Sequence, residues 1–270
     1  MRLTNFIYFL VPFLGGATTQ DKNVLLDAFF VCYGKINPES IKGYQLVVLE
    51  SAHYSPSEIA IFNENNTHVV AYISLTEVNK NASFYTDIAP FTFGENTTWN
   101  SCFMDLENKN VQRILEEEIR KIKQKGFQGL FIDNVDNVSK WGKLHHQKEA
   151  FVSFLKKIKT KHEELYLVQN AGLFLAEELD QVTNAIVVES VVSAYNFNEN
   201  AYALRDVETK RERINSLKLV RKKTKKPIYL IEYAKTNSMK KTILQELKKL
   251  GFKAFISQIN LQYFPKFENK

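Results

Sequence analysis

The sequence predicts a single-domain α/β protein of the (β/α)8, or TIM barrel, class. Short apolar runs alternate with amphipathic stretches of helical period, an order that produces parallel strands joined by right-handed crossovers. Eight such runs occur, at residues 29–34, 46–50, 69–74, 127–133, 165–170, 185–189, 228–232 and 253–257. Eight repeats favour a closed barrel over an open doubly wound sheet, and 270 residues suit one barrel, which typically takes about 250. No Gly-x-Gly-x-x-Gly follows the first run, which removes the usual dinucleotide-binding signal.

Residues 1–17 differ from the rest of the chain and are expected to be a signal peptide. Arg2 precedes an apolar run at residues 6–14, and Gly15 and Ala17 are small residues suited to a cleavage site after Ala17. The run is too short to cross a bilayer, which takes about 20 apolar residues. A buried N-terminal strand is the alternative. We therefore expect residues 18–270 to form a secreted or periplasmic barrel with no membrane anchor after cleavage.

Charge and cysteine content narrow the possible partners. The chain has 36 Lys and Arg against 30 Asp and Glu, and much of the excess lies in residues 210–226 and 240–249 at helical spacing. No aromatic residues interleave with these lysines, so a solvated helix face is expected and a nucleic-acid partner is not. Cys32 and Cys102 could pair in an oxidising compartment, but Cys32 lies in an apolar strand, where a buried thiol is more common.

One connection is much longer than the others. A helix with a regular apolar stripe begins near Val111 and is closed by Gly126, and residues 76–110 separate it from the third strand. This segment carries the aromatic residues Tyr85, Phe91, Phe93 and Trp99. Irregular loops longer than about 15 residues are usually functional or disordered, and the aromatic content argues against disorder. Because the loop follows a strand, we expect it to form a lid or substrate wall over the active face, with a plain packing loop as the alternative.

Polar and aromatic residues stand at the C-terminal ends of the predicted strands, where barrels keep their active sites. In chain order they are Tyr33, Glu50, Tyr72, Glu77, Asp133, Asp136, Asn170, Glu189, Glu232, Tyr233 and Gln258. Asp and Asn also end strands because they form good turns, so Asp133 alone decides little. Five strands each place a carboxylate at this mouth, which has no obvious set of cationic partners. We expect these carboxylates to raise each other's pKa values. Such a group can hold one protonated acid beside one ionised carboxylate.

Several chemistries could use these carboxylates. Glycoside hydrolysis needs one carboxyl to protonate the leaving oxygen and another to attack the sugar or activate water. A hard metal such as Mg²⁺ or Ca²⁺ is the second candidate, and a hydrolase of another ester or amide could use it. The histidines show no spacing suited to zinc, and no Gly-x-Ser-x-Gly is present. Aromatic rings at the mouth also suit sugar faces, so carbohydrate chemistry fits best, and no metal or cofactor is expected.

Several of these segments also resemble a known family. Residues 126–136, GFQGLFIDNVD, resemble the GFDGLFLDTLD strand of glycoside hydrolase family 114. Residues 71–78, 169–172, 188–190 and 231–234 resemble further segments of that family in the same order. The family comprises endo-α-1,4-polygalactosaminidase-like proteins, related to the hydrolase domain of the bacterial Pel exopolysaccharide system.

The resemblance implies a (β/α)8 barrel with its catalytic pair on the fourth and sixth strands. Asp133 is then the nucleophile or base and Glu189 the general acid. Apart from the resemblance, we expect the other strand-end residues, with Trp99, to bind substrate because of their places near the mouth. Gln128 and Thr76 stand where the family has Asp and Gly. The identity of the family's substrate is therefore not simply carried over to this chain. A net basic chain with an acidic mouth would attract a cationic amino-sugar polysaccharide. The alternative is a carbohydrate-binding barrel without turnover, and the sequence does not decide between retention and inversion.

Overall fold

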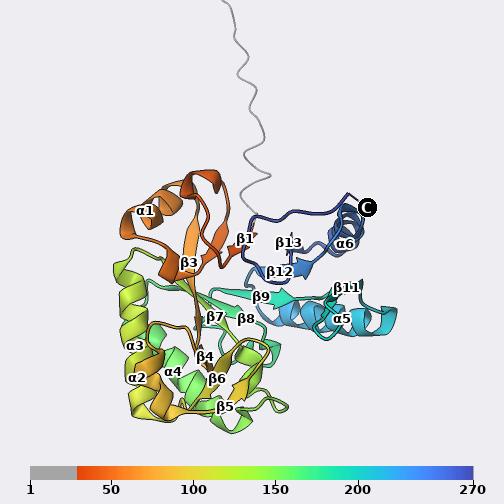
Figure 1. The fold of residues 1–270 in the computed structure, drawn as a ribbon. Coiled ribbons are helices and arrows are strands. Elements are labelled where there is room, and N and C mark those ends of the chain that lie inside the picture. The colour runs from red at the N-terminus through yellow and green to blue at the C-terminus, as the bar shows by residue number, and fades with distance from the viewer. Residues whose placement is uncertain (1–28, 270) are drawn as a thin grey trace, which may run out of the picture.

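The computed structural model describes residues 29–269, and the expected signal peptide lies outside them. Eight parallel strands form one sheet in the order β1–β2–β3–β7–β8–β9–β12–β13 (Figure 1). Their bounds are β1 (Phe29–Cys32), β2 (Leu46–Leu49), β3 (His68–Ser74), β7 (Gly129–Asp133), β8 (Tyr166–Asn170), β9 (Ala185–Glu189), β12 (Ile228–Tyr233) and β13 (Lys253–Ser257). Strand β13 also contacts β1, so the sheet is a nearly closed barrel, and the predicted fold class is confirmed.

The strands are apolar along nearly their whole length because one face of the sheet lines the barrel interior and helices cover the other face. Val47, Val70 and Phe131 are fully buried examples. No hydrogen-bonded ladder joins β13 to β1 within the described residues, and aromatic rings pack across this seam. The ring centroids of Phe30 and Phe255 lie 5.2 Å apart in an edge-to-face contact. Apolar packing therefore completes the barrel where backbone pairing stops.

Long helices follow five of the barrel strands. They are α1 (Pro56–Asn65), α3 (Lys109–Gln124), α4 (Lys148–Lys161), α5 (Val207–Lys223) and α6 (Asn237–Leu250). Figure 1 shows α3 and α4 on one side of the barrel and α5 and α6 on the opposite side. The connections from β1 to β2 and from β8 to β9 contain only the 3-10 turns η1 (Pro38–Ser40) and η6 (Leu173–Leu175). The short connection after β8 places residues of η6 at the barrel mouth.

The long connection after β3 is not an irregular loop, which corrects the sequence-based expectation. It contains β4 (Glu77–Asn79), α2 (Tyr85–Ile88), β5 (Thr92–Asn96) and β6 (Ser101–Met104), and its strands form an antiparallel sheet in the order β4–β6–β5. A hairpin that the sequence did not predict, β10 (Ser193–Asn196) and β11 (Ala201–Leu204), follows β9. The rings of Trp99 and Phe197 meet edge to face at 5.4 Å, which joins the two excursions.

The described residues bear on two smaller expectations. Cys32 in β1 and Cys102 in β6 are both buried free thiols, so the structure contains no disulfide between them. Among residues 29–269, no helix has the length and apolar character needed to span a bilayer.

Candidate active site

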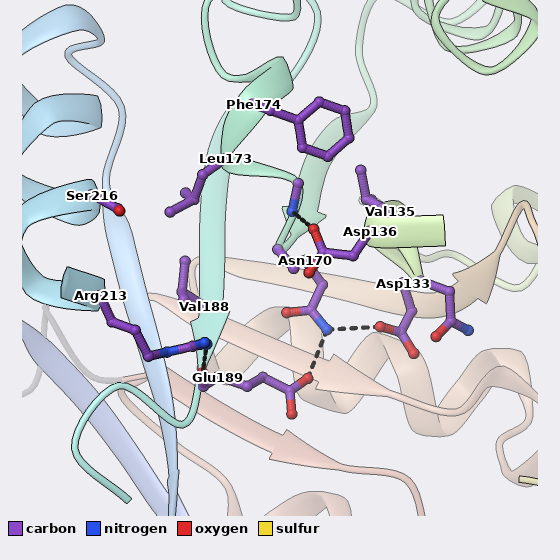
Figure 2. A pocket seen from close by; sticks show the side chains of 13 residues that line it. Asp133, Val135, Asp136, Asn170, Leu173, Phe174, Val188, Glu189, Arg213 and Ser216 are labelled. Atoms are coloured by element: carbon purple, nitrogen blue, oxygen red, sulfur yellow. Dashed lines mark hydrogen bonds between the residues drawn. The ribbon is translucent and has the colours of Figure 1, made fainter. Parts of the chain in front are cut away.

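Asp133, Asn170 and Glu189 are the last residues of three neighbouring strands, β7, β8 and β9. The side-chain nitrogen of Asn170, Nδ2, donates to Oδ1 of Asp133 and to Oε1 of Glu189, each at 2.7 Å (Figure 2). Because both oxygens lie at this distance from one nitrogen, they can be no farther apart than twice that distance, about 5.4 Å. The predicted pair is therefore brought together, and Asn170 links its members.

The backbone turns sharply directly after each of these three residues. Asn134, Ala171 and Ser190 have φ values of 58°, 60° and 55°, in the left-handed region that residues with a side chain rarely adopt. Conformations of this kind cost roughly 1 kcal/mol or more and persist where surrounding structure holds them, often at functional sites. The same turn follows three neighbouring strand ends, and after two of them the next residues, 134–136 and 171–174, line the cavity beside the site.

Three tyrosines surround the carboxylate pair. The Tyr233 hydroxyl donates to Oε2 of Glu189, and the Tyr72 hydroxyl interacts with Asp133. The ring of Tyr33 packs edge to face on Tyr72 at 4.9 Å. Burial, followed by the negative charge of Asp133 for Tyr33 and Tyr72 and of Glu189 for Tyr233, raises the pKa of each of these tyrosines well above its usual value. All three hydroxyls therefore stay protonated and can serve as donors at neutral pH.

Burial also dominates the titration of the two carboxyls. It raises the pKa of Asp133, while hydrogen bonds from Asn170, the Asn134 backbone and Tyr72 act in the opposite direction. Burial likewise raises the pKa of Glu189, and the charge of Asp133 raises it further. Both carboxyls are therefore harder to ionise than usual, and the charge of one disfavours ionisation of the other, so the pair can hold one proton between them.

A cavity of about 420 Å³ opens beside the pair and has two distinct sides. One side, here called the acidic lobe, consists of Asp133, Asp136 and Asn170, with the half-exposed ring of Phe174 above it (Figure 2). The other side, here called the arginine lobe, consists of Leu173, Val188, Arg213 and Ser216. Asp136 is anchored because its Oδ1 accepts a hydrogen bond from the Gly172 backbone nitrogen at 3.0 Å.

Three residues expected to bind substrate are instead engaged within the protein. Glu232 is fully buried and accepts hydrogen bonds from the backbone nitrogens of residues 191–193 and from the Ser193 hydroxyl. Glu77 is 6% exposed and accepts from Ser101, Asn96 and Asn137.

Gln258 is the third of these residues, and it pairs with the backbone of Lys266 in both directions, at 2.7 and 3.2 Å. Each of these side chains fastens a loop or the C-terminal segment, and none of the three is among the residues that line the cavity.

Glu50 and Trp99, also expected to bind substrate, are not among the residues that line the cavity. Glu50 is half-buried and caps the short turn η2 (Ser51–His53) by accepting from the Ala52 backbone nitrogen at 3.2 Å. Burial raises the pKa of Glu50, and its charge acts on Tyr72. Trp99 is 49% exposed and its ring contacts Phe197. A role of this exposed ring in a substrate wall stays a prediction.

Sequence reasoning missed the positive charge at this mouth. Arg213 of α5 donates from Nη2 to the backbone oxygen of Glu189 at 2.9 Å, and Arg205 donates from Nε to the backbone oxygen of Ser190 at 2.6 Å. The expectation of a mouth without cationic partners is therefore wrong. Arg213 lies in a helix rich in Lys and Arg, and no local pattern separates it from its solvated neighbours. Only the packing of α5 against the end of β9 reveals it.

No set of three or more His, Cys, Asp or Glu within residues 29–269 is placed to hold a metal ion.

Comparison with known proteins identifies relatives of the whole barrel. The model of glycoside-hydrolase family GH114 matches residues 17–270. The glycoside hydrolase domain of PelA from Pseudomonas aeruginosa has a TM-score of 0.79 and 24% identity, over 90% of this chain and 99% of that one. Aspergillus fumigatus Ega3, solved with galactosamine, has a TM-score of 0.70 and 14% identity, over 89% of this chain and 93% of that one. At these identities the structures show a shared fold. No curated protein matches the chain.

Proposed function

Because the chain belongs to glycoside-hydrolase family GH114, we propose that it cleaves glycosidic bonds with Asp133 and Glu189 as its catalytic pair. The observation that carries this proposal is the Asn170 amide, which holds one oxygen of each carboxyl at 2.7 Å. Retaining glycosidases hold their carboxyls about 5–5.5 Å apart, whereas inverting ones leave about 6.5–9.5 Å for a water molecule. The limit of about 5.4 Å between the two oxygens supports retention.

In this mechanism Asp133 is ionised and Glu189 is protonated at the start. Asp133 attacks the anomeric carbon, and the bond from that carbon to the leaving oxygen breaks as Glu189 gives this oxygen its proton. Water then attacks the same carbon, Glu189 accepts a proton from it, and the bond to Asp133 breaks. The Tyr233 hydroxyl stabilises Glu189 whenever it is ionised, and Asn170 keeps both groups oriented.

We propose an exported enzyme and an amino-sugar polysaccharide of the α-1,4-galactosaminide type as substrate. The structural similarity to Ega3, solved with galactosamine, supports this choice. So does the acidic lobe, since Asp136 has a second oxygen beyond its bond to Gly172 with which to hold an ammonium group. Export is supported by the signal-peptide pattern of residues 1–17 and predicts a mature protein that begins at Thr18. N-terminal sequencing of the secreted protein would test it.

The catalytic proposal is tested by measuring reducing ends released from α-1,4-linked galactosamine polymer. Asp133→Asn and Glu189→Gln should each lower the rate by at least about 1,000-fold, because each removes a reacting group. Glu149→Gln, at a carboxylate that is 81% exposed on α4, is the matched control and should retain full activity. Binding of the polymer by wild type without release of reducing ends would instead support the non-catalytic barrel. Inactivation by a chelator would support a metal-dependent hydrolase.

A further inference from the structure

Positive charge is concentrated in one part of the chain. Residues 207–253, which contain α5, β12 and α6, carry 15 Lys and Arg against four Glu, whereas the rest of the chain carries 21 Lys and Arg against 26 Asp and Glu. Helices α5 and α6 lie on the same side of the barrel (Figure 1), where Lys210 of α5 and Glu246 of α6 form an ion pair at 2.6 Å. The excess positive charge is therefore gathered on one side of the molecule.

Five exposed lysines of these two helices have no acidic partner. Among residues 29–269, no carboxylate forms an ion pair with Lys218, Lys222, Lys241, Lys248 or Lys249. The helices on the other side of the barrel differ, because Lys121 of α3 pairs with Glu118. Lys157 and Lys161 of α4 share Glu116. Unpaired charges of one sign add up to a field that attracts an oppositely charged surface.

The outer surface of α6 carries a shallow groove in which lysines surround a leucine. The groove has a volume of about 340 Å³ and is lined by Asn237, Lys240, Lys241, Leu244, Gln245 and Lys248. Leu244 is 43% exposed, and Leu219 of α5, which follows Lys218 in the chain, is 57% exposed. Single exposed leucines are common on protein surfaces, but both of these adjoin unpaired lysines. This side of the barrel therefore offers cations together with apolar side chains.

A membrane that carries anionic lipids has the matching chemistry. Its headgroups present phosphates to the lysines, whose aliphatic stems can lie along the apolar layer while their charged ends stay among the headgroups. Exposed leucines beside lysines can enter the boundary between headgroups and acyl chains, as on helices that lie in a membrane interface. A single-stranded nucleic acid fits less well, because its bases stack on aromatic rings and none lines the groove.

We propose that the groove on α6, with the unpaired lysines and exposed leucines of α5 and α6, is a docking surface for a membrane that carries anionic lipids. The contact is peripheral, because only the side chains of Leu219 and Leu244 would enter the bilayer. The groove shares no lining residue with the cavity at the strand ends, so docking leaves the catalytic pair accessible. Docking is therefore measured separately from the proposed function.

The test is co-sedimentation of the secreted protein with vesicles. Wild type should bind vesicles made of equal parts phosphatidylglycerol and phosphatidylcholine, should not bind phosphatidylcholine alone, and should be released by added NaCl. Each lysine close to an anionic membrane strengthens binding about fivefold. Combining Lys241→Gln, Lys248→Gln and Lys249→Gln should therefore weaken binding about 100-fold. The thermal unfolding of this variant should match that of wild type, because all three side chains are exposed.

The matched control combines Lys121→Gln, Lys157→Gln and Lys161→Gln. It removes the same net charge from exposed lysines of α3 and α4, and it should weaken vesicle binding less than about fivefold. Equal weakening by the two triple variants would show that net charge alone governs binding and would overturn the inference, as would failure of wild type to bind the anionic vesicles.

The leucines distinguish a membrane from a dissolved polyanion. Combining Leu219→Ser and Leu244→Ser should weaken vesicle binding about 10-fold, because both side chains lose their contact with the apolar layer. The same variant should bind polyphosphate as wild type does. Vesicle binding that does not change in this variant would assign the surface to a soluble polyanion and contradict docking on a membrane.

Discussion

Replacing Tyr233 with Phe tests the division of roles between the two carboxyls. Tyr233 is 2% exposed, and its hydroxyl donates to Oε2 of Glu189. Removing one oxygen atom leaves the ring and its packing in place. It withdraws a donor that favours the ionised form of Glu189, which raises the pKa of that group further.

The size of the effect follows from the interaction removed. A buried hydrogen bond to a charged group contributes about 1.5–3 kcal/mol, and one pKa unit corresponds to about 1.36 kcal/mol. We therefore expect a rise of about one to two units. If Glu189 is the general acid, activity is lost when it deprotonates, so the alkaline limb of the pH profile of kcat/KM moves upward by this amount. The rate at the optimum should fall as well, because the carboxylate formed during bond cleavage loses its donor.

Tyr72→Phe is the matched variant, since Tyr72 lowers the pKa of Asp133. Its loss should move the acidic limb upward, because the nucleophile must be ionised. The limbs belong to a coupled pair, so the comparison between the two variants carries the argument. The assay is a pH series of reducing-end release from pH 3 to 9. Movement of the acidic limb by Tyr233→Phe and of the alkaline limb by Tyr72→Phe would refute the assignment and exchange the roles.

Three further predictions concern stability and are read by thermal and urea unfolding. Glu232→Gln should cost about 2–4 kcal/mol, because an amide cannot accept from all four donors around it. Ala171→Gly should be neutral or stabilising by up to about 1 kcal/mol at its positive φ, whereas Gly172→Ala should be destabilising because its Cβ would meet Val135 at 2.2 Å. Asp133→Asn should raise the melting temperature near pH 7, because burial raises the pKa of Asp133 and so makes its ionised form costly in the folded protein. The gain should vanish below pH 3.8, the usual pKa of Asp, because the carboxyl is then protonated in both the folded and the unfolded chain.

The barrel could be predicted from the sequence because its signals are local. Eight apolar runs and the helices between them follow from periodicity, and each predicted run coincides with a strand of the sheet. The excursions after β3 and β9 could not be predicted in the same way. Their strands are three to five residues long, too short for alternation to show, and they pair with partners that only the folded chain brings near.

The site was predictable to the extent that a strand end determines position. Asp133, Asn170 and Glu189 end neighbouring strands, so parallel register brings them together. Arg213 enters from the middle of a helix, and its place depends on how α5 packs against β9. Register is encoded by local pattern, whereas helix packing depends on contacts between segments far apart in the chain, so the carboxylates were found and the arginine was not.

The acidic residues at the strand ends therefore differ in what surrounds them and not in where the sequence places them. Glu232 and Glu77 each have several donors from backbone or side chains, and such saturated carboxylates can stabilise loops but have little capacity left for a ligand. Asp133 and Glu189 also have donors, but they share the amide of Asn170, lie next to each other and border an open cavity. Burial makes both costly to ionise, and a pair of such carboxyls beside a cavity is the arrangement that would let one proton move between the protein and a substrate near neutral pH.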